Sequence, residues 1–190
     1  YYWVLNIEYN IIDELGRPRE IGTFQIDVGN AERFNIKYVD ENGEQRYPVI
    51  IHTALIGSIE RYLYALLDTA ALMEKRGEIP RLPTWVAPVQ VRIIPVDESL
   101  IEEAVKLAEK LASRSIRVDV DDRRESVSKR VRDAEDKWIP YIVVLGRKEV
   151  SEGKLSVRIR GSEVTKMSVS ELEKRILEEL EGYPKLRLTM

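Results

Sequence analysis

The chain has 190 residues, one histidine, no cysteine and a formal charge of −3. This length allows one large domain or two small ones. The lack of cysteine excludes disulfides, thiolate zinc sites and cysteine nucleophiles within the chain, and the small net charge means that any contact with nucleic acid must depend on a local patch. No apolar run reaches the roughly 20 residues that a membrane span needs. Because the sequence opens inside a strand-like run without methionine, we expect a piece of a longer protein.

The first half of the chain predicts antiparallel strands followed by a helix. Two strand-like runs, 1–13 and 19–29, are joined by a turn that contains glycine and proline. Asn42-Gly43 is the strongest short hairpin signal, and it lies between two further strand-like runs. Apolar residues then recur at helical spacing over 58–75, and a glycine soon after ends the pattern.

The second half of the chain has a different pattern. The segment 77–88 carries three prolines and is the expected boundary between a domain at 1–80 and a domain at 81–190. Alternating strands and helices beyond it are typical of an α/β unit. The overall prediction is α/β with an α+β first part: an antiparallel sheet with a helix, then a mixed, mostly parallel sheet with three helices. The expected strands are 89–96, 115–120, 141–146 and 155–160, and the expected helices are 98–113, 126–138 and 168–181.

Polar residues in the first half allow both a structural and a functional interpretation. His52 ends an apolar run and has no second histidine or cysteine to share a metal, so a hydrogen-bonded core histidine is the simpler interpretation. Arg61 follows the predicted cap Ser58 and is either a solvated first-turn residue or a guanidinium fork for phosphate or carboxylate. Thr23 and Gln25 lie on the polar face of an alternating strand, which is either the wet side of a sheet or a substrate floor.

Basic residues cluster twice in the second half, each time among acidic ones. Helix N-termini and arginine side chains both favour phosphate, but an ion-paired surface explains the clusters equally well. No glycine-rich phosphate loop, Ser/His/Asp set or HExxH motif occurs. The basic residues are Arg123, Arg124, Lys129, Arg130 and Arg132 in the first cluster and Arg147, Lys148, Arg158 and Arg160 in the second.

The order of these segments resembles the C-terminal part of threonyl-tRNA synthetase. Residues 20–68, which include "IHTALIGSIER", are similar to the end of its catalytic domain with the third signature motif of class II synthetases. The run "PTWVAPVQVRIIPV" resembles the start of its anticodon-binding domain, and 117–161 resembles the continuation. The similarity covers essentially the whole chain. The "IHTALIGSIER" block is specific, whereas the anticodon domain is shared with prolyl-, histidyl- and glycyl-type relatives.

The resemblance implies a role for the single histidine. In that family the histidine before the third motif is a zinc ligand, and His52 matches it. Zinc holds the amino group and hydroxyl of threonine, so valine, which lacks the hydroxyl, leaves the metal unsatisfied. The other two ligands of the family belong to earlier parts of its catalytic domain. On this interpretation His52 alone binds zinc poorly.

The remaining site residues are also implied by the resemblance. Arg61 matches the catalytic residue that stabilises ATP charge during adenylate formation. The expected ATP-binding residues are Glu20, Thr23, Ser58 and Arg61, with Mg accompanying ATP; the expected threonine-binding residues are Gln25 and His52; and the expected anticodon-reading residues are Arg124, Glu149 and Arg158. Unstacked loop bases are read on their edges and by stacking, which suits such polar groups.

The resemblance implies a cytoplasmic threonine–tRNA ligase whose partners are threonine, ATP and tRNA(Thr) and whose full-length form is a homodimer without membrane contact. We expect the chain by itself to be inactive but to retain anticodon-loop binding. One alternative is a non-catalytic synthetase-like module for tRNA binding. Another is a synthetase of the same subclass with a different amino acid, against which His52 argues.

Overall fold

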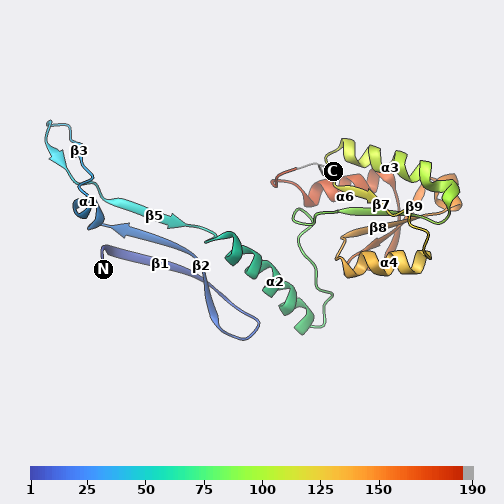
Figure 1. Ribbon diagram of the computed structural model, residues 1–190, viewed down its shortest axis with the longest axis horizontal. Coiled ribbons are helices and arrows are strands. Elements are labelled where there is room, and N and C mark those ends of the chain that lie inside the picture. Colours follow the sequence, from blue (N-terminus) through green and yellow to red (C-terminus); the bar gives the residue numbers. More distant parts are fainter. Residues whose placement is uncertain (186–190) are drawn as a thin grey trace. The chain divides into compact units, whose positions relative to one another are not determined.

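The computed structural model describes residues 1–185, and the chain divides into two compact units, 1–76 and 77–190 (Figure 1). Because each unit makes its contacts mainly within itself, the two are described separately. No helix within residues 1–185 is long and apolar enough to cross a lipid bilayer.

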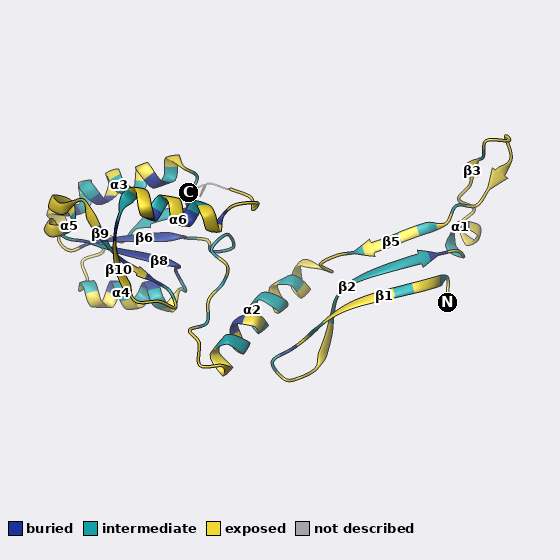
Figure 2. Cartoon of the chain, turned by 180° about the vertical axis from the view of Figure 1, so that it is seen from behind, coloured by how far each residue is buried: buried dark blue, intermediate teal, exposed yellow. Residues whose placement is uncertain are grey.

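The first unit contains an antiparallel sheet of β1 (Trp3–Ile12), β2 (Pro18–Asp27) and β5 (Ile50–Ala54), in that order. The expected hairpin between the first two strands is confirmed, and Gly16 lies in its turn. Leu5 and other apolar residues of this sheet are exposed, so its strands are coloured mainly as exposed or intermediate in Figure 2.

A small excursion between β2 and β5 carries a helix and a second hairpin. The helix α1 (Asn30–Arg33) is a single turn, and β3 (Tyr38–Val39) pairs with β4 (Gln45–Arg46). The expected Asn42-Gly43 turn is confirmed: Gly43 has φ +78°, a conformation that residues with a Cβ rarely adopt.

The helix α2 (Ile59–Lys75) has the expected bounds, since Ser58 caps it by accepting a hydrogen bond from the backbone N–H of Arg61. The turn of the first hairpin is tied to this helix. The buried Asp13 carboxylate accepts a hydrogen bond from Tyr64 Oη at 3.0 Å, and Asp68 Oδ1 accepts one from the backbone of the turn at 3.0 Å. The first hairpin and the middle of α2 are therefore held together.

The second unit is built on a mixed sheet, and its order is confirmed as α/β. Across the sheet the strands are β10 (Val164–Ser168), β9 (Lys154–Ile159), β8 (Tyr141–Leu145), β6 (Val91–Pro95) and β7 (Val118–Val120). Within the described residues, β9 runs in the opposite direction to the other four strands.

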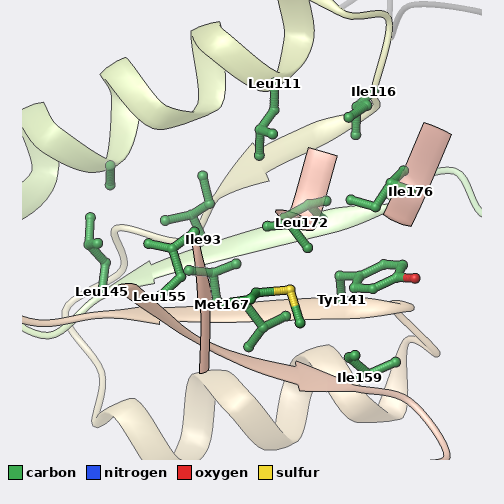
Figure 3. Close-up of a cluster of buried hydrophobic side chains, with 14 of the residues drawn as sticks. Ile93, Leu111, Ile116, Tyr141, Leu145, Leu155, Ile159, Met167, Leu172 and Ile176 are labelled. Carbon is green, nitrogen blue, oxygen red and sulfur yellow. The ribbon is translucent and has the colours of Figure 1, made fainter. Parts of the chain in front are cut away.

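The three expected helices of this unit cover both faces of the sheet (Figure 1). The helices α3 (Ile101–Ser113) and α6 (Val169–Glu179) cover one face, and α4 (Val127–Asp136) covers the other. Figure 3 shows Leu111 of α3 and Leu172 of α6 pointing toward the sheet around Ile93, and all three side chains are buried. Removal of such apolar surface from water supplies most of the stability of the unit.

The expected helix 98–113 begins as the 3-10 turn η1 (Glu98–Leu100) and continues as α3. Two elements of the second unit were not expected from the sequence, the short helix α5 (Arg147–Glu152) and the edge strand β10. The helix α5 is too short to show a helical period. The strand β10 is mostly exposed, with Met167 as its buried residue, so it lacks a clear alternation.

Candidate functional site

A row of polar side chains crosses the sheet of the first unit. Gln25 is paired with Asn6 on one side and with His52 on the other, so the three side chains lie on one face. Asn6 Oδ1 accepts hydrogen bonds from Gln25 Nε2 and Thr23 Oγ1, both at 3.1 Å. The structure therefore brings together three of the expected substrate-site residues, Thr23, Gln25 and His52, and joins Thr23 and Gln25 through Asn6.

His52 is held by a buried carboxylate. Its Nε2 lies 2.7 Å from Oδ2 of Asp27, and the imidazole is 43% exposed while the carboxylate is fully buried. The core-histidine interpretation is therefore only partly met: one ring nitrogen has a partner, but the ring reaches the surface. The polar alternation of the strand predicted a shared face for Thr23 and Gln25, whereas the contact of Asp27 with His52 depends on strand pairing.

The charge of Asp27 is stabilised at this position. Burial by itself raises the pKa of Asp27, but hydrogen bonds from the Asn30 backbone, the His52 ring and the Gly29 backbone outweigh it and lower the pKa to about 2. The group is therefore a carboxylate at neutral pH and can only accept hydrogen bonds.

Arg61 lies in a second group at the start of α2. Its Nη1 is 3.5 Å from Oε1 of Glu20, and both side chains are partly exposed. Gly57 makes this approach possible: it has φ +63°, and a Cβ there would lie 2.9 Å from Cδ of Arg61 and 3.1 Å from the carbonyl oxygen of Ile21. Within residues 1–185, no hydrogen bond or ion pair joins this group to His52.

Glu149 is a fixed acceptor in the second unit. Its Oε1 accepts a hydrogen bond from Ser156 Oγ at 2.8 Å, and its Oε2 accepts one from the backbone of Gly146 at 3.1 Å. The hydrogen bond from Ser156 is the largest of the effects that lower the pKa of Glu149. The first turn of α5 is thereby attached to β9.

Arg158 and Arg124 lie in different settings. Arg158 is two positions from Ser156 on β9, so the two share a face; its side chain is 45% exposed and lies 3.4 Å from Glu135. Arg124 is highly exposed and its Nε lies 3.0 Å from Oε1 of Glu98. Among the described residues, no hydrogen bond or ion pair joins Arg124 to Glu149 or Arg158.

Three other basic residues of the first cluster are engaged within the protein. Arg123 pairs with Asp121 and Asp133, and Lys129 pairs with Glu125. Arg130 is buried and donates hydrogen bonds to two backbone carbonyl oxygens. The ion-pair interpretation thus accounts for Arg123 and Lys129.

The described residues supply one imidazole toward a metal site. No group of three His, Cys, Asp or Glu side chains placed to hold a metal ion occurs within residues 1–185. His52 keeps its second nitrogen, Nδ1, without a hydrogen-bond partner in the part of the chain that the structure describes. This donor set fits one corner of a zinc site.

Two family models match the chain. Residues 5–70 match the tRNA synthetase class II core domain (G, H, P, S and T), and residues 90–179 match the anticodon binding domain. The chain therefore belongs to the class II aminoacyl-tRNA synthetases, with a core segment followed by an anticodon-binding segment.

Individual relatives narrow this class. The threonine–tRNA ligase of Thermofilum pendens is 63% identical over 98% of this chain, and that of Pyrobaculum calidifontis is 65% identical over 97%. The RNA binding domain of threonyl-tRNA synthetase from Cryptosporidium parvum superposes with a TM-score of 0.75 at 28% identity, covering 94% of this chain and 43% of that one. The chain is homologous to threonine–tRNA ligases over nearly its whole length, and it spans about 30% of the length of these two ligases.

Proposed function

We propose that this chain supplies the third motif and the anticodon-binding part of a threonine–tRNA ligase, which activates threonine with ATP and transfers it to tRNA(Thr). The observation that carries the proposal is identity above 60% to ligases of that name over nearly the whole chain. The names of these relatives do not favour the alternative of a non-catalytic module. A homodimer of the complete protein stays a prediction.

In this proposal the group around Arg61 binds ATP. A guanidinium at the first turn of α2 presents parallel N–H donors to phosphate oxygens, and it stabilises charge that develops as the adenylate forms. Its long contact with Glu20 can be exchanged for a contact with ATP, since both side chains are partly exposed. Ser58 fixes the start of the helix, and Thr23 lies on the polar face of the sheet. Mg accompanies the phosphates of ATP.

Gln25 and His52 bind threonine in this proposal. His52 would hold zinc through its free nitrogen together with ligands from elsewhere in the ligase. When bound, zinc supplies a Lewis acid to which the amino and hydroxyl groups of threonine can bind. The amide of Gln25, held by Asn6, contributes a polar neighbour. A site built to satisfy a hydroxyl rejects valine strongly, because polar groups are then left unpaired.

The second unit recognises the anticodon loop in this proposal. Glu149 presents a fixed carboxylate, which can accept hydrogen bonds from base amino groups. Arg158 and Arg124 are exposed enough to reach base edges or phosphates. Their present partners, Glu135 and Glu98, are surface carboxylates whose ion pairs are weak.

A segment exchange tests the proposal. The matching segment of the Thermofilum pendens ligase is replaced by this chain, and the chimaera is assayed for attachment of threonine, serine and valine to tRNA. We expect threonine-specific charging, and we expect loss of that charging with His52→Ala. A folded chimaera that binds tRNA but charges no threonine would contradict the enzyme assignment and support the binding module.

A further inference from the structure

The hydrogen bond between Asp27 and His52 has a donor and an acceptor that neither the family models nor the relatives assign. The two residues are 25 positions apart and meet because β2 pairs with β5. Nε2 of the imidazole faces Oδ2 of the carboxylate at 2.7 Å, and the carboxylate is fully buried while the ring is 43% exposed. The buried carboxylate thus holds the ring at Nε2, while the ring itself reaches the surface.

The carboxylate is oriented without help from the ring. Its Oδ1 accepts hydrogen bonds from the backbone N–H groups of Gly29 and Asn30, both at 2.9 Å. Its Oδ2 accepts a hydrogen bond from Asn30 Nδ2 at 2.8 Å and can accept a second one from His52. Three donors from one loop therefore determine where Oδ2 points.

An ionised carboxylate can only accept hydrogen bonds, so Nε2 of His52 must be the donor. In a neutral imidazole one nitrogen carries the proton and the other carries a lone pair. The lone pair then lies on Nδ1, the nitrogen that has no hydrogen-bond partner within residues 1–185.

We propose that Asp27 is a positioning residue for His52: it keeps the proton on Nε2 and leaves Nδ1 as the nitrogen that binds the metal ion. This inference rests on the proposed function, in which His52 is a zinc ligand. Carboxylates that accept the second N–H of a metal-binding histidine fix its tautomer and raise its basicity, and their loss costs about 10- to 100-fold in metal affinity.

Asp27→Asn is the most informative variant, because the backbone N–H groups of Gly29 and Asn30 determine how the new amide is oriented. Two backbone N–H groups require an oxygen at the Oδ1 position, so the NH₂ group takes the Oδ2 position, and the side-chain amide of Asn30 must turn to present its oxygen there. There it donates to Nε2, which becomes an acceptor, and the proton moves to Nδ1. We therefore expect the substitution to reverse the tautomer and weaken zinc binding about 10- to 100-fold.

Nitrogen-15 NMR of the untagged chain tests this directly, since its single histidine gives one unambiguous pair of ring signals. At pH 8 we expect the Nε2–H form in the unsubstituted protein and the Nδ1–H form in Asp27→Asn. Asp40→Asn is the matched control: Asp40 also accepts two backbone N–H groups on Oδ1 and one arginine on Oδ2, away from His52. It should leave the tautomer unchanged.

The unsubstituted protein alone can overturn the inference, even if Asp27→Asn fails to fold. An Nδ1–H form, a mixture of both forms, or a doubly protonated ring at pH 8 would contradict it, as would an unchanged tautomer in folded Asp27→Asn. Addition of Zn²⁺ separates the proposed function from the inference. Perturbation of Nδ1 supports both, and perturbation of Nε2 instead contradicts the inference. An Nε2–H ring unaffected by zinc in this chain supports the role of Asp27 in orienting the ring. The metal role of His52 is then tested by the zinc content of the chimaera, which His52→Ala should lower and which, if unchanged, would contradict that role.

Discussion

The hydroxyl of Ser156 donates a hydrogen bond to Oε1 of Glu149 at 2.8 Å, which joins strand β9 to the first turn of α5. The other oxygen of this carboxylate accepts the backbone N–H of Gly146. Glu149 is thus held in one orientation before any RNA arrives, and an ordered acceptor loses little conformational freedom on binding.

Ser156→Ala should weaken binding of a stem-loop RNA with a threonine anticodon by roughly tenfold, because loss of one hydrogen bond to a charged group costs about 1.5 kcal/mol. Glu149 keeps its charge in this variant but loses one of its two anchors. Fluorescence anisotropy of the labelled RNA measures the change. Ser170→Ala, on the exposed part of α6, is the control and should bind as the unsubstituted chain does. Equal loss in both variants would contradict the role of Ser156.

Arg61→Ala in the chimaera should weaken ATP binding by about 2 kcal/mol, or roughly thirtyfold, because a charge-assisted contact with phosphate is lost. Arg61→Lys should lose part of this, since ammonium keeps the charge but not the planar fork. Isothermal calorimetry with Mg-ATP gives both values. Arg33→Ala, an exposed arginine over the ring of Phe34, serves as the control. An unchanged ATP affinity in Arg61→Ala would refute the assignment.

Acid should destabilise the first unit within a defined range of pH. Burial raises the pKa of Asp13 and of Asp27, but hydrogen bonds outweigh this effect and lower both, for Asp27 to about 2. The unfolded chain, whose aspartates have ordinary pKa values, therefore takes up protons first as the pH falls. The stabilisation is present above about pH 4 and is lost progressively toward about pH 2.

Thermal unfolding followed by the NMR amide signals of β2 at pH 5 and pH 2.5 tests this expectation. The unfolding midpoint should fall at the lower pH, and it should fall less in Asp27→Asn, which is already destabilised at pH 5. If the midpoint fell equally in the variant and in the unsubstituted chain, Asp27 would not contribute to the acid sensitivity.

The core of the second unit offers a direct test of packing. Ile93 is fully buried on β6, an interior strand of the sheet, so Ile93→Ala should lower the free energy of unfolding by about 2–5 kcal/mol through lost burial and a residual cavity. Val164→Ala, on the edge strand with a half-exposed side chain, should cost less than about 0.5 kcal/mol. Urea unfolding measures both, and similar costs at the two positions would contradict the core described here.

Local signals predicted most elements of the fold. The Asn42-Gly43 turn and the cap at Ser58 each act within a few residues, so the sequence alone places them correctly. The helices α1 and α5 were missed because one or two turns show no period. The first turn of α5 is held by the contact of Glu149 with Ser156 on β9, whereas α1 begins beside hydrogen bonds from the backbone of Gly29 and Asn30 to Asp27.

The same distinction applies to the site. Period-two alternation predicted that Thr23 and Gln25 share a face, and the sheet confirms it. The contact of His52 with Asp27 depends on the register of two strands that are not adjacent in sequence, and no local pattern specifies that register. The role of Asp27 therefore became visible only in the structure.

Anticodon selectivity tests whether this chain belongs to a ligase for threonine and its tRNA. The chain is titrated with a stem-loop that carries a threonine anticodon and with the same stem-loop carrying a changed anticodon. We predict preferential binding of the threonine stem-loop and loss of the preference in Arg158→Ala, with Lys106→Ala on α3 as the charge-matched control. Equal affinity for the two stem-loops in the unsubstituted chain would contradict the account.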